Sequence, residues 1–69
     1  MPLYMAENGQ TVTIVRISGN DHIKKHLENL GFVVGETVHM VNKVDESVII
    51  KVKGVSLAIS HELAKRITF

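Results

Sequence analysis

Cysteine and tryptophan are absent from this 69-residue chain. Without cysteine there can be no disulfide framework and no thiolate metal site, which fits a reducing compartment. Aromatic residues are also scarce, since Tyr4, Phe32 and Phe69 are the only ones. So few aromatic rings make a base-stacking platform for single-stranded nucleic acid an unfavoured interpretation.

The chain also lacks a strong charge of either sign and a long apolar run. Eight basic and seven acidic residues give a net charge of +1, too small a field to predict nucleic-acid binding. No segment approaches the roughly 20 apolar residues that span a bilayer, and the first residues do not resemble a signal peptide. We therefore expect a single cytoplasmic domain over residues 1–69 that neither crosses a membrane nor is exported by a signal peptide.

No group of residues in the sequence forms a recognisable catalytic constellation. There is no cysteine nucleophile, no serine in a nucleophile elbow and no glycine loop of the kind that binds phosphate. No spaced carboxylate pair with a plausible cleft is present either. The sequence favours a non-enzymatic binding or regulatory module.

Two glycines four residues apart, Gly31 and Gly35, mark the most informative stretch. Residues Asp21–Leu30 before them have the 3.6-residue period of a helix with one apolar stripe. The stripe consists of Ile23, Leu27 and Leu30. Asn20 or Asp21 can cap the start of this helix, and Gly31 follows at the position where a left-handed residue ends it. Gly35 then predicts a turn into the next strand.

The rest of the chain reads as short strands. They are expected at Thr11–Ser18, Thr37–Val44, Ser47–Val52 and Val55–Ser60, with a last one at Ile67 and Phe69. The alternation of apolar residues breaks within the first strand, which predicts a bulge or burial on both faces. Lys53-Gly54 predicts a tight turn, and His61–Lys65 a single helical turn. Together these elements predict a mainly β fold, a small antiparallel barrel of about five strands with one short helix.

The second and third strands predict a candidate interaction face. If their inward residues must lie opposite each other, Val44 pairs with Val48 and Met40 with Val52, leaving Asp45–Ser47 as a three-residue loop. The outward face would then carry His39, Val41, Lys43, Ile49, Lys51 and Lys53. A mixed apolar and basic face of this kind is typical of a partner-binding surface. In the alternative interpretation, Val41 and Ile49 pack beneath the helix or the N-terminal segment.

His22 and His26 are candidate metal ligands, because two imidazoles four residues apart on a helix can meet one ion. Asp21, His61 or Glu62 could complete a shell suited to Fe(II) or Zn(II), although nothing in the sequence brings them together. The alternative is that both are ordinary surface histidines, and no cofactor is expected with certainty.

Several basic residues could converge into a strip that binds phosphate. They are Lys43, Lys51, Lys53, Lys65 and Arg66. A solvated charged face is the alternative, and it agrees with the small net charge.

The order and spacing of these motifs resemble the FeoA family. Three stretches carry the resemblance: Gly9 to Gly19 with its β-branched strand; Leu27, Leu30, Gly31, Phe32, Gly35 and Val38; and Leu57-Ala58-Ile59 followed by Ala64-Lys65-Arg66-Ile67. One departure lies at Asp45-Glu46-Ser47, in the loop between the second and third strands, where family members usually carry a glycine, often beside proline. We expect structural roles for Leu27, Leu30, Gly31, Gly35 and Ala64, which lie in these stretches, and for Gly54, which makes the tight turn after Lys53.

The resemblance also implies a fold and a function. The fold would be an SH3-like barrel, which is shared with the C-terminus of iron-dependent repressors. The function would be that of a cytosolic accessory in Fe(II) uptake, docking on the transporter FeoB or its GTP-binding domain and reaching the membrane only through that partner. The alternative is a free-standing domain that binds nucleic acid or regulates transcription, although the chain has no helix-turn-helix unit of its own.

Overall fold

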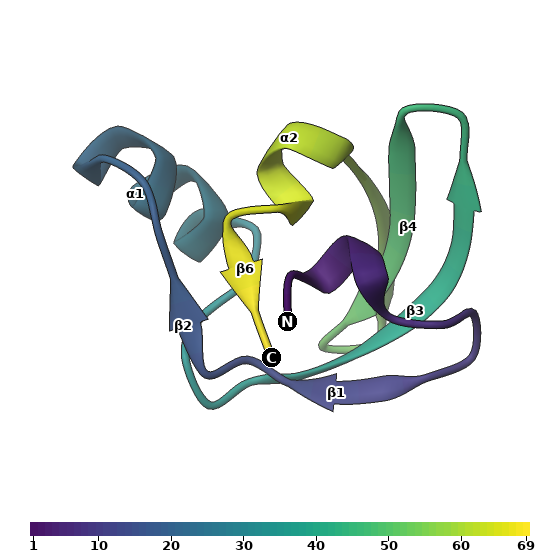
Figure 1. Ribbon diagram of the computed structural model, residues 1–69. Coiled ribbons are helices and arrows are strands. Elements are labelled where there is room, and N and C mark those ends of the chain that lie inside the picture. The colour runs from purple at the N-terminus through teal and green to yellow at the C-terminus, as the bar shows by residue number, and fades with distance from the viewer.

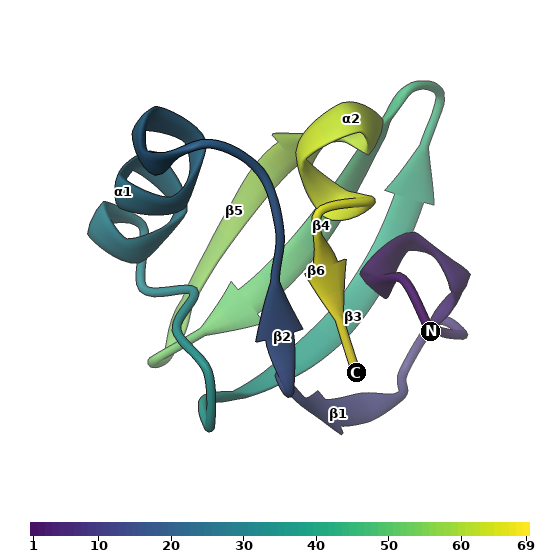
Figure 2. The ribbon, with the colours of Figure 1, turned by 60° about the vertical axis from the view of Figure 1, so that its left-hand side comes forward.

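Two small antiparallel sheets enclose the core in the computed structural model, which describes all residues 1–69 (Figure 1). The elements, in chain order, are η1 (Leu3–Met5), β1 (Thr11–Thr13), β2 (Arg16–Ile17), α1 (Asp21–Asn29), β3 (Thr37–Val44), β4 (Ser47–Val52), β5 (Val55–Ser60), α2 (His61–Ala64) and β6 (Ile67–Thr68). One sheet has the order β1-β3-β4-β5, and the other pairs β2 with β6. Figure 2 shows the β2–β6 pair lying in front of the larger sheet. The predicted mainly β class is confirmed, although the hydrogen bonds do not run around a closed ring.

The helix α1 begins and ends where its local sequence predicts. The Asn20 side-chain oxygen accepts a hydrogen bond from the Ile23 N–H at 2.9 Å. At the other end Gly31 has a φ of +101°. The Gly31 N–H donates to the Glu28 carbonyl and the Phe32 N–H to the Leu27 carbonyl, both at 2.9 Å. These two bonds form a Schellman motif, which satisfies carbonyls that the last turn would otherwise leave unpaired.

Gly35 makes the second turn of this stretch. Its φ is +92°, and its N–H donates to the Ile14 carbonyl at 2.7 Å. This bond ties the loop after α1 to the end of β1. β3 begins two residues later, at Thr37, so the predicted turn from helix to strand is confirmed.

The prediction of one strand over Thr11–Ser18 is wrong, because the chain turns a corner at Ile14 and Val15. β1 pairs with β3, whereas β2 pairs with β6. Ile14 is buried and hydrogen-bonds to Gly35 and Glu36, while Val15 is 60% exposed and its N–H donates to the Thr68 carbonyl. The broken alternation in the sequence marks the passage from one sheet to the other.

The predicted register of β3 and β4 is also wrong. Val44 lies opposite Ser47, so the connection is the two-residue turn Asp45-Glu46 rather than a three-residue loop. The register shifts between Met40 and Asn42, where Val41 is the extra residue of a β-bulge. Because of the bulge, the residues after Val41 project to the opposite side of the sheet from that expected by simple alternation. Before the bulge, buried Met40 lies opposite buried Ile50.

The core is entirely apolar. No polar or charged side chain is buried, and Phe32 is the largest fully buried residue. The N-terminal segment contributes Leu3 and Ala6, which the sequence pattern did not single out. None of the helices has the length and apolar character needed to cross a membrane.

Candidate functional site

The outer face of β3, β4 and β5 is the broadest candidate interaction surface. Paired residues of antiparallel strands project to the same side, so the register defines three rows on this face. The rows are Val44, Ser47 and Ser60; Asn42, Ile49 and Ala58; and His39, Lys51 and Ser56. The intervening rows point inward and include buried Val48, Ile50 and Val52. We call the three outward rows, together with Val41 of the bulge, the outer face.

The structure places four of the six residues predicted for this surface on the outer face: His39, Val41, Ile49 and Lys51. Lys43 is a correction, since it lies opposite buried Val48 and therefore projects to the other side of the sheet. The bulge causes this change, because it reverses the phase after Met40.

Lys53 is the second correction. It lies in the turn between β4 and β5, with a φ of +51°. Its ammonium is 3.9 Å from a Glu36 carboxylate oxygen. Its aliphatic stem lies beside Gly31, so it contacts the end of the α1 segment rather than extending the outer face.

Neither Val41 nor Ile49 belongs to the buried core, in contrast to the alternative interpretation that both pack beneath the helix or the N-terminal segment. Val41 is 41% exposed, and Ile49 is half-buried. Val44, which the predicted register had turned inward, is 43% exposed and lies on the same face. Three branched apolar side chains therefore face solvent on neighbouring positions of two strands.

A hollow of about 810 Å³ opens on the outer face at the β3–β4 turn. Its lining residues are Val44, Asp45, Glu46, Ser47, Ile49 and Ala58. The sequence interpretation missed it because a three-residue loop kept Val44 on the inner face. A two-residue turn with a compensating bulge is the register that would have revealed it.

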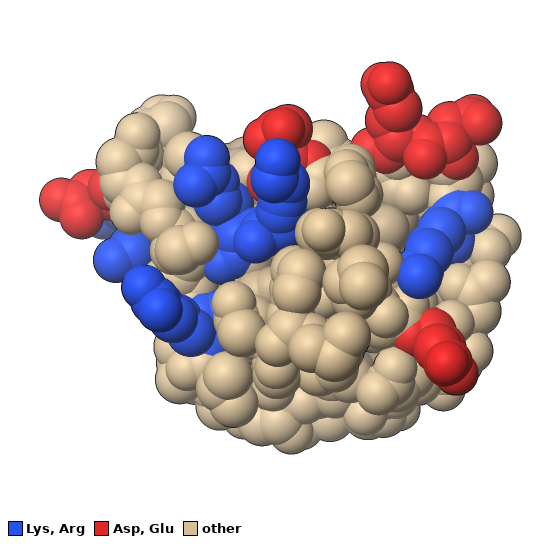
Figure 3. Space-filling view, viewed as in Figure 1, with Lys and Arg blue, Asp and Glu red and all other residues tan.

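The predicted phosphate-binding strip does not come together. Lys51 and Lys43 project to opposite sides of the sheet. Lys53 pairs with Glu36, and Lys65 pairs with Glu62 at 3.3 Å. Figure 3 shows the charges separated, with acidic side chains gathered at the tip of the β3–β4 hairpin.

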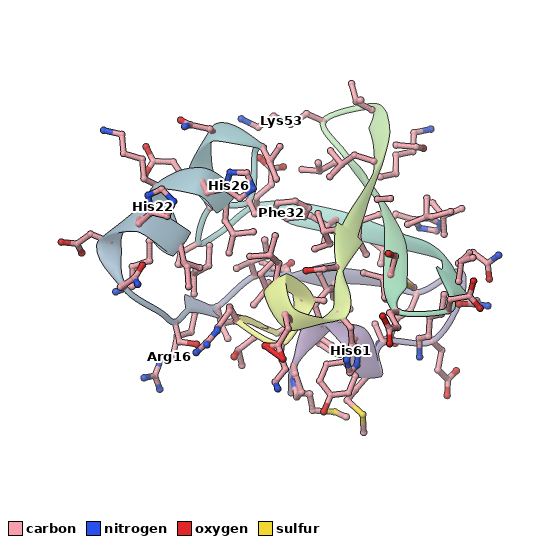
Figure 4. All side chains as sticks on the ribbon, turned by 90° about the horizontal axis from the view of Figure 1, so that it is seen from above. Arg16, His22, His26, Phe32, Lys53 and His61 are labelled. Carbon is pink, nitrogen blue, oxygen red and sulfur yellow. The ribbon has the colours of Figure 1, made fainter.

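His22 and His26 lie on one side of α1 (Figure 4). With Asp21, Lys25 and Asn29 they line a shallow hollow of about 320 Å³. Of the residues proposed to complete a metal shell, Asp21 lines this hollow. His61 and Glu62 are elsewhere, on α2, with the ring centroid of His61 4.2 Å from that of Tyr4. No group of three or more His, Asp or Glu side chains is positioned to hold a metal ion. The structure therefore brings together the two imidazoles and no third ligand.

A family model described as the FeoA domain matches residues 1–68. The chain belongs to the FeoA family. A search of curated proteins found no match. Of the positions predicted to be structural, Leu27 and Ala64 are fully buried, Leu30 is half-buried against the core, and Gly31, Gly35 and Gly54 have positive φ.

Solved structures of other FeoA proteins are similar over nearly the whole chain. The crystal structure of an iron uptake regulatory protein (FeoA) is 29% identical, with a TM-score of 0.91, and the match covers 97% of this chain and 91% of that one. The FeoA of Stenotrophomonas maltophilia, solved in complex with zinc, is 30% identical, with a TM-score of 0.84 and coverage of 99% and 87%. A manganese-dependent transcriptional repressor is 14% identical, with a TM-score of 0.88, over 97% of this chain and 39% of the repressor. That likeness shows a shared SH3-like fold.

Proposed function

We propose that this FeoA-family protein is a non-enzymatic cytoplasmic accessory of ferrous iron transport that docks on an FeoB-type transporter. Family membership supports the role in iron transport. Two similar structures support it as well, since one is described as an iron uptake regulatory protein and the other as a candidate ferrous iron transport activating factor. The outer face supports docking by protein contact.

The observation that carries the docking proposal is the exposure of branched apolar side chains on the outer face. Val41 and Val44, both on β3, are each more than two-fifths exposed. Ile49 is half-buried and lies on β4, the strand between β3 and β5. Contiguous apolar surface of this kind is typical of interaction sites. His39 and Lys51 occupy the neighbouring row, which gives the face a polar margin like that of transient interfaces.

Replacing Val41 with glutamate tests the proposal. The variant should bind the purified GTP-binding domain of the transporter at least about tenfold more weakly, because a carboxylate would lose its hydration in the contact. Titration calorimetry measures this change. Thermal unfolding should stay close to that of the unmodified protein, since the bulge leaves this side chain in solvent.

Val15→Glu is the matched control, because Val15 is 60% exposed at the corner between the two sheets. It should bind the transporter domain normally. An equal loss of affinity for the transporter domain in both variants, or unfolding of Val41→Glu, would contradict docking through the outer face. A salt-sensitive shift of DNA or RNA by this protein would favour the alternative role in nucleic-acid binding.

We further propose that His22 and His26 bind Zn(II) or Fe(II) weakly, with the other ligands supplied by water. Their spacing on α1 and the hollow between them support this, as does the zinc complex of the S. maltophilia relative. Titration with Zn(II), or with Fe(II) under anaerobic conditions, should move the imidazole resonances of both residues. The resonances of His39 and His61 serve as internal controls, and unmoved His22 and His26 signals would dispose of the site.

A further inference from the structure

We propose that the hollow at the β3–β4 turn receives an apolar side chain from a positively charged segment of the partner protein. This inference rests on the proposed docking function and specifies the chemistry of the contact. Three independent features of the hollow carry it: its apolar floor, its fixed shape and its unpaired acidic rim.

The floor of the hollow is apolar and spans three strands. Val44, Ile49 and Ala58 line it, one from each of β3, β4 and β5. Adjacent strands are about 4.8 Å apart, so three strands offer a floor about 10 Å wide. The volume of the hollow, about 810 Å³, is enough to take one or two branched side chains. An apolar side chain placed there would remove both its own surface and that of Val44 from water.

The shape of the hollow is held by hydrogen bonds. The Glu46 carbonyl accepts the N–H of His61 at 2.8 Å, which fastens the turn to the start of α2. The next residue of the hairpin, Ser47, lies opposite Ser60, the residue that precedes His61. A site that is ordered before binding loses less conformational entropy when it is occupied.

The rim of the hollow is negatively charged and its carboxylates are free. Asp45 and Glu46 are both exposed, and neither forms an ion pair. The nearest basic residue in sequence, Lys43, projects to the opposite side of the sheet. Glu62, which lines a smaller hollow beside Glu46, is neutralised by Lys65 at 3.3 Å. The rim therefore attracts a cationic segment and repels nucleic acid or an acidic peptide.

A pair of synthetic peptides tests this chemistry directly. One alternates leucine with lysine, and the other alternates leucine with glutamate. In two-dimensional NMR the lysine peptide should shift the amide signals of Val44, Ile49 and Ala58, and the shifts should shrink as salt is added. The glutamate peptide should leave these signals in place. Equal shifts from both peptides, or shifts confined to the row of His39 and Lys51, would overturn the proposal.

Variants of the hollow test the same contact with the transporter domain. Asp45→Asn, which suits the positive φ of that residue, combined with Glu46→Lys should weaken binding about tenfold or more, whereas Glu28→Lys, which reverses an exposed charge on α1, should change it little. Ala58→Trp fills the hollow and should also weaken binding. Val55→Trp is its matched control and should bind normally, since Val55 is 60% exposed on the same strand but pairs with inward Val52 and therefore projects away from the outer face.

The outcomes separate this inference from the function on which it rests. If the unmodified protein binds neither the full transporter nor its GTP-binding domain, the proposed docking is wrong whatever the peptides do. If it binds, and the variant with Asp45→Asn and Glu46→Lys and the Ala58→Trp variant bind equally well, the contact lies elsewhere on the protein and the inference about the hollow is wrong. Each variant should keep the unmodified fold by circular dichroism, because all of these positions are exposed.

Discussion

The Phe32→Ala variant is expected to lose about 3–5 kcal/mol of its free energy of unfolding, a large part of the stability of so small a domain. Phe32 is fully buried and is the largest side chain in the core. Truncation of a buried phenylalanine costs about 3–5 kcal/mol, since it removes apolar burial and leaves a cavity. A domain of this size has a free energy of unfolding of only about 3–10 kcal/mol. Urea unfolding followed by circular dichroism measures the loss.

Val34→Ala is the control for this prediction, because it truncates a side chain two residues away that is 62% exposed. Its free energy of unfolding should change by no more than about 0.5 kcal/mol. A loss below about 1 kcal/mol for Phe32→Ala would show that the core can repack around the missing ring, contrary to our expectation.

The Gly31→Val variant should lose about 3 kcal/mol of stability. A β-carbon at this position would lie 3.5 Å from a Val52 methyl group, which is an ordinary contact, so there is space for the side chain. The cost comes from the backbone, since φ is +101° and a β-branched residue adopts such a conformation only under strain. Relaxing that strain would break the Schellman hydrogen bonds at the end of α1.

Asparagine at the same position separates backbone strain from other effects. Gly31→Asn should lose only about 1 kcal/mol, because asparagine tolerates positive φ better than valine does. Binding of both variants to the transporter domain should follow the folded fraction measured by chemical denaturation. A Gly31→Val protein that is fully folded yet unable to bind would assign this glycine a direct role in the contact.

Local signals in the sequence were sufficient for the helix and its surroundings. Asn20, the apolar stripe of α1 and Gly31 act within a few residues of each other, so their pattern specifies where the helix begins and ends. The tight turn at Lys53-Gly54 is confirmed for the same reason, since both residues have positive φ.

Features that depend on distant segments were not predictable in the same way. The corner at Ile14 and Val15 forms because β2 pairs with β6 at the far end of the chain. Likewise, when the apolar residues of two paired strands would face opposite sides of the sheet, either an extra loop residue or a β-bulge can bring them to the same side. The sequence pattern does not distinguish these two solutions. Here the N-terminal segment also bonds to this strand, as the Gly9 N–H donates to the Met40 carbonyl at 2.7 Å.

The candidate site shows the same difference between features that depend on local sequence and features that depend on distant segments. His39, Val41, Ile49 and Lys51 were placed on one face correctly because that assignment depends only on alternation within a strand. Lys43 was misplaced because it lies beyond the bulge. The hollow was missed for the same reason, since it needs Val44 to face outward.

The separation between the two sheets also sets the order in which the fold can assemble. β3, β4 and β5 are joined by two-residue turns, so they can pair by closing only short loops, each in about microseconds. The pairing of Ile17 with Ile67 joins opposite ends of the chain, and the loop that it closes costs more entropy. Pulse-labelling hydrogen exchange should therefore protect β4 amides before those of β6. The surface proposed for docking would be complete before the two ends of the chain meet.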